Sequence, residues 1–157
     1  MAINSIVLKL PDEEFVVARL LKNPVDFKIA LSHFYNMTDA TSFEKLLSEH
    51  LQLAAEYIKA TMALDIDKAD DLEKKWYQNA DDISSLLSCM NPYWSRETWQ
   101  KMFYEHLGMV TDKAVYMINK NYDEGTNSQD LLEMGTLNMA DIMYGGIIKQ
   151  FPYKFYN

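Results

Sequence analysis

Two stretches of this chain carry the same sequence pattern, and each has the form of a helical hairpin. The tripeptide Glu-His-Leu occurs at 49–51 and again at 105–107, a shift of 106 − 50 = 56 residues. The dipeptide Ala-Asp occurs at 80–81 and again at 140–141, a shift of 141 − 81 = 60 residues. An insertion of four residues at 121–127 reconciles the two shifts. Such a repeat predicts two similar units that bury their apolar faces against each other.

Apolar side chains in both stretches recur every three or four residues, which is the spacing of one face of an α-helix. The first of four long helices is predicted to begin at a capping box formed by Thr41 and Glu44. The other three are predicted to begin at Asp65 or Asp67, at Ser95 and at about Ser128. Segment 121–127 is rich in turn-forming residues and is predicted to be a loop. Gly145 and Gly146 fall inside the last helix, and we interpret them as a place where a neighbouring helix packs closely against bare backbone.

The N-terminal part of the chain predicts two short helices, 11–21 and 25–35, separated at Pro24. Proline disfavours helical geometry in the residue before it and suits the first turn of the next helix. Glu13 precedes Pro24 by eleven residues, which is the interval between aspartate and proline in both later hairpins. We therefore interpret this region as the return arm of a third hairpin, whose outgoing arm is reduced to residues 3–10.

These patterns predict an all-α fold in a single domain of 157 residues. The expected architecture is a bundle of four long helices from a duplicated hairpin, with short N-terminal helices. The short helices occupy 1–36, the first hairpin 41–92 and the second hairpin 95–152. Hydrophobic residues make up 48% of the chain, which is enough for a sizeable core, and 5 Gly and 4 Pro are too few for a turn-rich all-β fold.

Charge and missing motifs narrow the classes of function. A net charge of −8 without clustered Lys and Arg argues against binding to nucleic acid or to an anionic membrane. No apolar run approaches the ~20 residues that span a bilayer. The single cysteine, Cys89, is expected to be a small buried hydrophobe and fits a reducing compartment, so we expect a cytoplasmic protein. The glycines form no phosphate-binding loop and no Gly-x-Ser-x-Gly elbow occurs, so no kinase, nucleotide-binding or hydrolase activity is predicted.

The candidate functional residues are two histidines and two aspartates at equivalent places in the repeat. His50 and His106 lie on the apolar face of the outgoing helices. Asp81 and Asp141 lie at the edge of the apolar face on the return helices. If each hairpin folds back through a short loop, each histidine faces an aspartate inside the bundle. One interpretation is structural: two His–Asp hydrogen bonds satisfy buried polar groups and fix the helix register.

The other interpretation is a metal site, because helical bundles often hold metals and imidazole and carboxylate groups suit iron, zinc and manganese. The predicted ligands are His50, His106, Asp81 and Asp141. Glu49 and Glu105 are weaker candidates, since each lies one residue, or ~100°, around the helix from a histidine. The Glu-x-x-His signature of di-iron carboxylate bundles is absent, which disfavours that class of oxidase.

Several segments together resemble a family of short all-helical proteins found in spore-forming Gram-positive bacteria. The matching segments are Leu10-Pro-Asp, Ala18-Arg-Leu-Leu-Lys-Asn-Pro, Leu47-Ser-Glu-His-Leu, Trp76-Tyr-Gln-Asn-Ala-Asp, Asn91-Pro-Tyr-Trp-Ser, Tyr104-Glu-His-Leu and Ile147-Ile-Lys-Gln-Phe-Pro. The resemblance implies an additional N-terminal helix in the family, with its own Gln-His pair and a Trp-Thr-Arg segment, and this chain begins after it. Some members carry an acetylglutamate kinase label, which nothing in this sequence supports. The Glu-His helices are also similar to those of a family of duplicated metal-binding helical proteins.

The sequence favours a non-enzymatic protein that acts through protein contacts or self-association. The reason is the absence of any nucleophile, phosphate or cofactor motif. The alternative is a metal-binding bundle that uses the paired His and Asp residues with iron, zinc or manganese. The expected partners are a second copy of the chain or another protein, and neither a nucleic acid nor a membrane.

Overall fold

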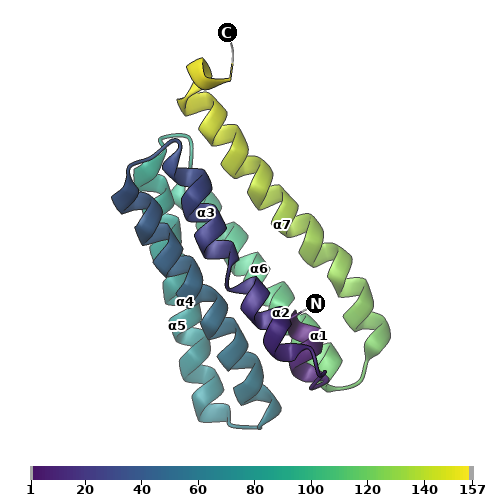
Figure 1. Ribbon diagram of the computed structural model, residues 1–157. Coiled ribbons are helices and arrows are strands. Elements are labelled where there is room, and N and C mark those ends of the chain that lie inside the picture. The colour runs from purple at the N-terminus through teal and green to yellow at the C-terminus, as the bar shows by residue number, and fades with distance from the viewer. Residues whose placement is uncertain (1, 156–157) are drawn as a thin grey trace.

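The computed structural model describes residues 2–155, and all regular structure in that range is helical (Figure 1). The elements are α1 (Ala2–Val7), α2 (Glu13–Leu20), α3 (Asn23–Ser32), α4 (Met37–Met62), α5 (Ile66–Met90), α6 (Arg96–Ile118), α7 (Tyr122–Gln150) and a final 3-10 turn, η1 (Pro152–Lys154). The predicted all-α class is confirmed. The four long helices have 26, 25, 23 and 29 residues. None of the helices in the described range is long and apolar enough to span a membrane.

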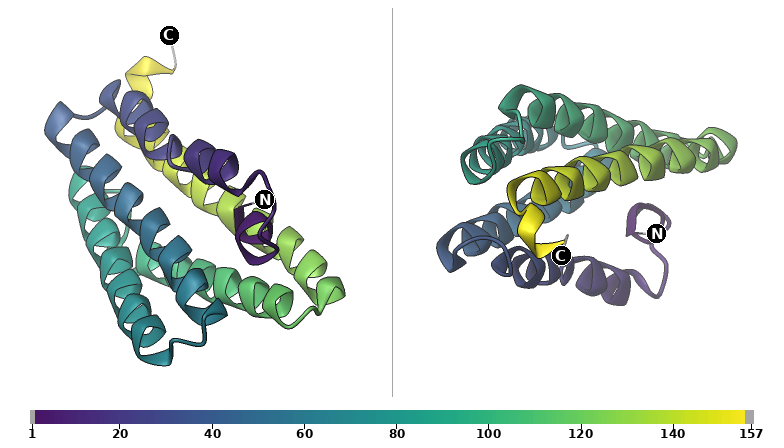
Figure 2. Two further views of the ribbon diagram at one scale, coloured as in Figure 1. Left: turned by 60° about the horizontal axis from the view of Figure 1, so that its bottom comes forward. Right: turned by 90° about the horizontal axis from the view of Figure 1, so that it is seen from above.

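The long helices form two antiparallel hairpins, α4 with α5 and α6 with α7 (Figure 1). Helix α3 packs along α4, and α1 packs on both α4 and α6. Helix α7 packs on α6 along the second hairpin, and its axis diverges from those of α4 and α5 (Figures 1 and 2). The segment from α1 to α3 therefore packs against both hairpins, with α3 on α4 and α1 between α4 and α6.

Local capping chemistry confirms two of the four predicted starts of the long helices. The side chain of Asp65 accepts a hydrogen bond from the backbone N–H of Lys68, and Ser95 caps α6 in the same way. The capping box at Thr41 is wrong, because α4 begins one turn earlier. Asn36 caps it by accepting a bond of 2.9 Å from the N–H of Asp39. The Thr-x-x-Glu spacing alone does not distinguish a helix start from a helix interior.

The predicted loop at 121–127 is also wrong, since α7 begins at Tyr122. The connection is only 119–121, and Lys120 at its centre has φ 60°. The α4–α5 connection has the same length, and Leu64 at its centre has φ 58°. Leu64 and Lys120 are separated by 120 − 64 = 56 residues, which is the first shift of the sequence repeat. Gly125, the residue that most favoured a loop, is buried in α7 close to Met117. The four extra residues therefore lengthen α7 by a turn (29 − 25 = 4) and not the loop.

The N-terminal segment repeats this connection a third time. Lys9 lies between α1 and α2 with φ 50°, and the N–H of Leu10 bonds to the carbonyl of Ser5 at 2.9 Å. In the two long hairpins the matching bonds span the same five residues. Both predicted short helices are present, as α2 and α3, but α2 buries none of its residues. Descent of the hairpins from one duplicated unit stays a prediction from the sequence.

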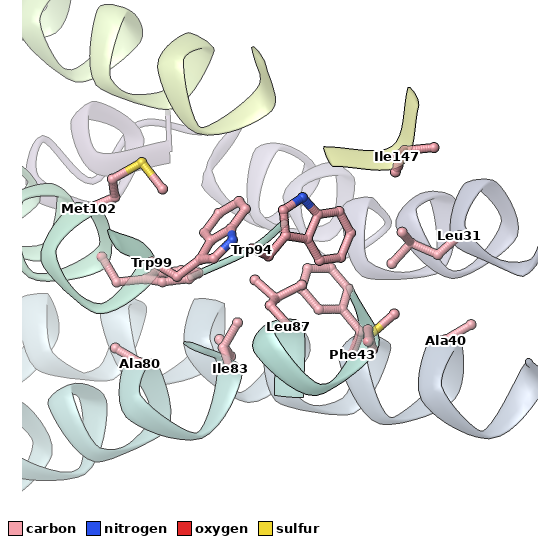
Figure 3. Close-up of a cluster of buried hydrophobic side chains, with 12 residues drawn as sticks. Leu31, Ala40, Phe43, Ala80, Ile83, Leu87, Trp94, Trp99, Met102 and Ile147 are labelled. Carbon is pink, nitrogen blue, oxygen red and sulfur yellow. The ribbon is translucent and has the colours of Figure 1, made fainter. Parts of the chain in front are cut away.

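The core between the hairpins is built around two tryptophans, Trp94 in the α5–α6 link and Trp99 in the first turn of α6. Trp94 is 2% exposed and lies between Ile147 of α7 and Leu87 of α5, with its indole nitrogen towards α7 (Figure 3). A Cβ placed on Gly146 would come within 2.0 Å of that nitrogen. Close packing on bare backbone is thus confirmed at Gly146, but the neighbour is Trp94 of the α5–α6 link and not a helix. A Cβ on Gly145 would meet nothing within 4 Å.

We expect Gly146→Ala to lower the free energy of unfolding by about 1–3 kcal/mol, because the indole of Trp94 must shift in a filled core. The matched control is Gly145→Ala, which adds the same methyl group in open space. That control should raise the free energy of unfolding by up to about 1 kcal/mol through helix propensity. Urea unfolding followed by circular dichroism measures both. Equal effects of the two variants would contradict the packing role of Gly146.

Candidate functional site: two histidines at an apolar cavity

His50 on α4 is buried and belongs to a hydrogen-bonded network with α5. Its Nδ1 lies 2.8 Å from Oδ1 of Asn79, and its Nε2 lies 3.2 Å from Nε1 of Trp76. The indole N–H of Trp76 can only donate, so Nε2 of His50 accepts and Nδ1 carries the proton that is donated to Asn79. Asn79 in turn donates to the carbonyl of Leu46 at 3.1 Å. Both nitrogens of His50 are therefore satisfied in the neutral imidazole.

This environment disfavours the charged form of His50. Burial lowers the pKa of His50 from 6.5 to about 4, and the hydrogen bond to Asn79 opposes this only in part. A positive charge on His106 would lower the pKa further. Protonation would also place two donors, Nε2–H and the indole N–H of Trp76, against each other. His50 is consequently a neutral side chain that fixes the register of α4 and α5.

The predicted pairing of His50 with Asp81 is wrong. Asp81 is only half-buried, and its Oδ1 accepts hydrogen bonds from Gln100 at 2.7 Å and from the hydroxyl of Tyr104 at 3.0 Å. These partners belong to α6, so Asp81 links the two hairpins and leaves the first hairpin without a His–Asp contact. Asn79 takes the predicted place of the aspartate because it lies two residues earlier, on the face of α5 that meets α4.

His106 on α6 has no counterpart to this network. Its Nδ1 is buried without a hydrogen-bond partner, and burial lowers its pKa. Asp141, the predicted partner, is exposed and makes no hydrogen bond to His106 within the described residues. The second expected His–Asp pair is therefore wrong as well.

The metal hypothesis finds no support in the geometry. Over residues 2–155, no three His, Cys, Asp or Glu side chains lie close enough together to hold a metal ion. Glu49 is exposed, and its carboxylate accepts a hydrogen bond of 3.3 Å from the side-chain amide of Asn79. Glu105 is also exposed and forms an ion pair with Lys101. Cys89 is exposed too, which corrects the expectation that it fills the core.

Both histidines line one large cavity between the two hairpins. Its volume is about 540 Å³, and side chains from each of the helices α1 to α7 line it, with Trp76 and Leu87 contributed by α5. Most of the wall is apolar; representative lining residues are Ile6, Phe43, Leu47, Trp99, Phe103, Val110, Leu132, Met139 and Met143. The few polar lining groups, besides the histidines, include Gln129 and Thr136 on α7. The axis of α7 diverges from those of α4 and α5 (Figure 2), and residues of α4, α6 and α7 all line the cavity.

The sequence alignment that predicted the repeat shows which residues differ around the two histidines. The shift of 60 residues places Thr136 at the position of Trp76 and Met139 at the position of Asn79. Both replacements line the cavity beside His106. The second hairpin thus has the histidine of the first without its polar partners, and has open space in their place. The sequence held this signal, because the repeat alignment names both substitutions.

Comparison with protein-family models, with curated proteins and with solved structures gave no match to this chain. The resemblance to the family of spore-forming bacteria stays a prediction. The chemistry of the site must therefore be inferred from its own residues. Within the described residues, neither histidine hydrogen-bonds to a hydroxyl, a thiol or a carboxylate, so neither is placed to activate a nucleophile.

We expect the pH dependence of stability to report the neutral state of His50. The pKa of His50 is lower in the folded protein than its ordinary value of 6.5, so the unfolded state binds more protons between pH 6.5 and about 4. The contribution of neutral His50 to the free energy of unfolding is therefore fully present above pH 6.5 and is lost as the pH falls towards 4. The contribution of His50 to this loss should be about 3 kcal/mol.

Chemical denaturation of the wild type and of His50→Gln at pH 7 and pH 4.5 measures this contribution. The variant cannot titrate at this position, so its stability should fall less than that of the wild type. Carboxylates contribute nearly equally to both proteins and cancel in the comparison. Identical losses in the two proteins would show that His50 is not held neutral.

Proposed function

We propose that this protein is a non-enzymatic binding protein, and that its central cavity receives the apolar part of a ligand. The observation that carries the proposal is the apolar cavity of about 540 Å³ between the hairpins. Cavities of this size and composition are typical of small-molecule sites, in which a few polar groups set the orientation.

The energetics of the cavity favour an occupant. The cavity is partly open to solvent and its wall is mainly apolar, so in the ligand-free protein apolar side chains remain in contact with water. Water gains few hydrogen bonds at such a wall. An apolar ligand gains roughly 25 cal/mol for each Å² removed from water.

The neutral histidines fit binding better than catalysis. Burial keeps the pKa values of His50 and His106 low, so the cavity presents no cationic imidazole near neutral pH. His50 is fully engaged with Trp76 and Asn79. His106 has one nitrogen without a partner and can bond to a polar group of a ligand.

The uncharged fluorescent probe N-phenyl-1-naphthylamine should bind saturably, with one site per chain, and should brighten on transfer to the apolar cavity. Leu132→Trp fills space at the cavity wall, so it should weaken binding at least tenfold. Ile66→Trp is the control, because Ile66 is 71% exposed, lies outside α7 and does not line the cavity. Absence of saturable binding to the wild type, or equal binding by both folded variants, would contradict the proposal.

Self-association, the function expected from the sequence, is supported by a second feature. Helix α7 presents an outward apolar stripe, made of Leu131, Met134, Leu137 and Tyr144, all more than half exposed. The stripe spans about 20 Å at 1.5 Å per residue. The occupant that fits it best is the stripe of a second copy, packed antiparallel about a twofold axis near residues 137–138, which would place Leu131 opposite the partner's Tyr144.

Charge along α7 favours the same arrangement. Asp123 and Glu124 lie in its first turn, whereas Lys149 lies in its last turn and Lys154 follows in η1. Antiparallel pairing brings the acidic end of one helix beside the basic end of the other. The resulting ion pairs would be exposed, and they would select orientation more than they add affinity.

Sedimentation velocity at micromolar concentrations should show a dimer that Leu137→Glu converts to monomer. The introduced charge would be buried at the centre of the interface without a partner. Ile66→Glu is the control, because Ile66 is 71% exposed and lies at the far end of the first hairpin. A wild-type monomer at these concentrations would overturn self-association and leave the cavity proposal standing.

A further inference from the structure

Lys113 on α6 is a buried cation without an acidic partner. It is 2% exposed, and its Nζ donates to Oε1 of Gln129 on α7. The ion pairs found over residues 2–155 do not include Lys113. An ammonium group has three donors, and burying it beside a neutral amide leaves both its charge and part of its hydrogen-bonding capacity uncompensated. Such an arrangement is costly unless an anion completes it.

The position of Lys113 ties this cation to the cavity. It follows Val110 by three residues and His106 by seven, so the three share one face of α6. Val110 and His106 line the cavity, and so does Gln129, the partner of the ammonium group. The cation therefore lies one side chain beyond the cavity wall, at the end nearest the α6–α7 connection.

The remainder of the wall is long and apolar. From Val110 back to Trp99 the lining residues of α6 extend over eleven residues, or about 16 Å. Met139 and Met143 of α7 contribute flexible thioether side chains that adapt to the shape of a ligand. Lys113 does not itself line the cavity, but its ammonium group lies directly behind Gln129 at one end of an extended apolar wall. This arrangement fits an elongated molecule with one anionic end.

We propose that the cavity binds a long-chain carboxylic acid, with its carboxylate at Lys113 and Gln129 and its chain along α6 towards Trp99. This inference rests on the proposed binding function of the cavity and adds the class of ligand. The ammonium of Lys113 and the amide N–H of Gln129 both donate to the carboxylate, and His106 lies beside the chain. A phosphate would call for more donors than one lysine and one amide provide, which is why the structure favours a carboxylate.

Competition against the bound fluorescent probe at pH 7.5 tests the ligand class. Dodecanoate should displace the probe at a concentration at least tenfold lower than 1-dodecanol, which has the same chain without the charge. Dodecyl phosphate should compete more weakly than dodecanoate. Equal displacement by the acid and the alcohol would overturn the acid site and leave the apolar cavity in place. Failure of the probe itself to bind would remove both proposals.

Two variants assign the acid preference to Lys113. Lys113→Met should abolish the difference between dodecanoate and 1-dodecanol, and it should raise the melting temperature of the ligand-free protein by removing a buried charge. Lys101→Met is the control, because its ammonium group lies on the exposed face of α6 and meets only Glu105. It should leave both affinities unchanged. A Lys113→Met protein that still prefers the acid would overturn the assignment to Lys113. The comparison of dodecanoate with 1-dodecanol on the wild type tests the acid site even if that variant does not fold.

Discussion

The contact between Trp94 and the bare backbone of Gly146 determines how the second hairpin meets the first. It fixes the C-terminal part of α7 against the core formed by α4, α5 and the link that follows α5. The other end of α7 is fixed by the short left-handed connection at Lys120. A straight helix held at these two ends cannot also follow the surface of the first hairpin, because its axis diverges from α4 and α5. The cavity is the consequence of these two constraints.

Within this frame, two histidines from equivalent positions in the repeat have different surroundings. His50 meets a return helix that supplies Trp76 and Asn79, so its imidazole is neutral, satisfied and structural. His106 faces the cavity together with Thr136 and Met139 of its return helix. The same residue type therefore has a structural role in one hairpin and lines a binding space in the other. This asymmetry separates a fold-stabilising network from a site open to a ligand.

Part of this arrangement could be predicted from particular residues. The spacing of apolar side chains predicted four long helices, and Asp65 and Ser95 marked two of their starts correctly. The predicted loop at 121–127 was wrong, although Gly125 is a typical turn residue. Gly125 is buried against Met117 within α7, and this packing favours the helix. Asp81 was expected to face His50. The angular position of a residue around the helix decides which neighbouring helix its side chain contacts, and the sequence pattern gives that angle only approximately. Two residues, or about 200° of rotation, separate Asn79 from Asp81 and send their side chains to different helices.

The sequence by itself determined the all-helical class, the hairpin lengths and the inward direction of both histidines, because these depend on local periodicity and capping. Only the tertiary structure decided which polar groups became partners, and that the space beside His106 stays open. It also revealed that Lys113 is buried, which no local pattern indicates for a residue type that is normally solvated. The physical reason is that burial and pairing depend on the distance and angle between helices. Those quantities are fixed by contacts such as that of Trp94 with Gly146, between residues more than fifty positions apart in the chain.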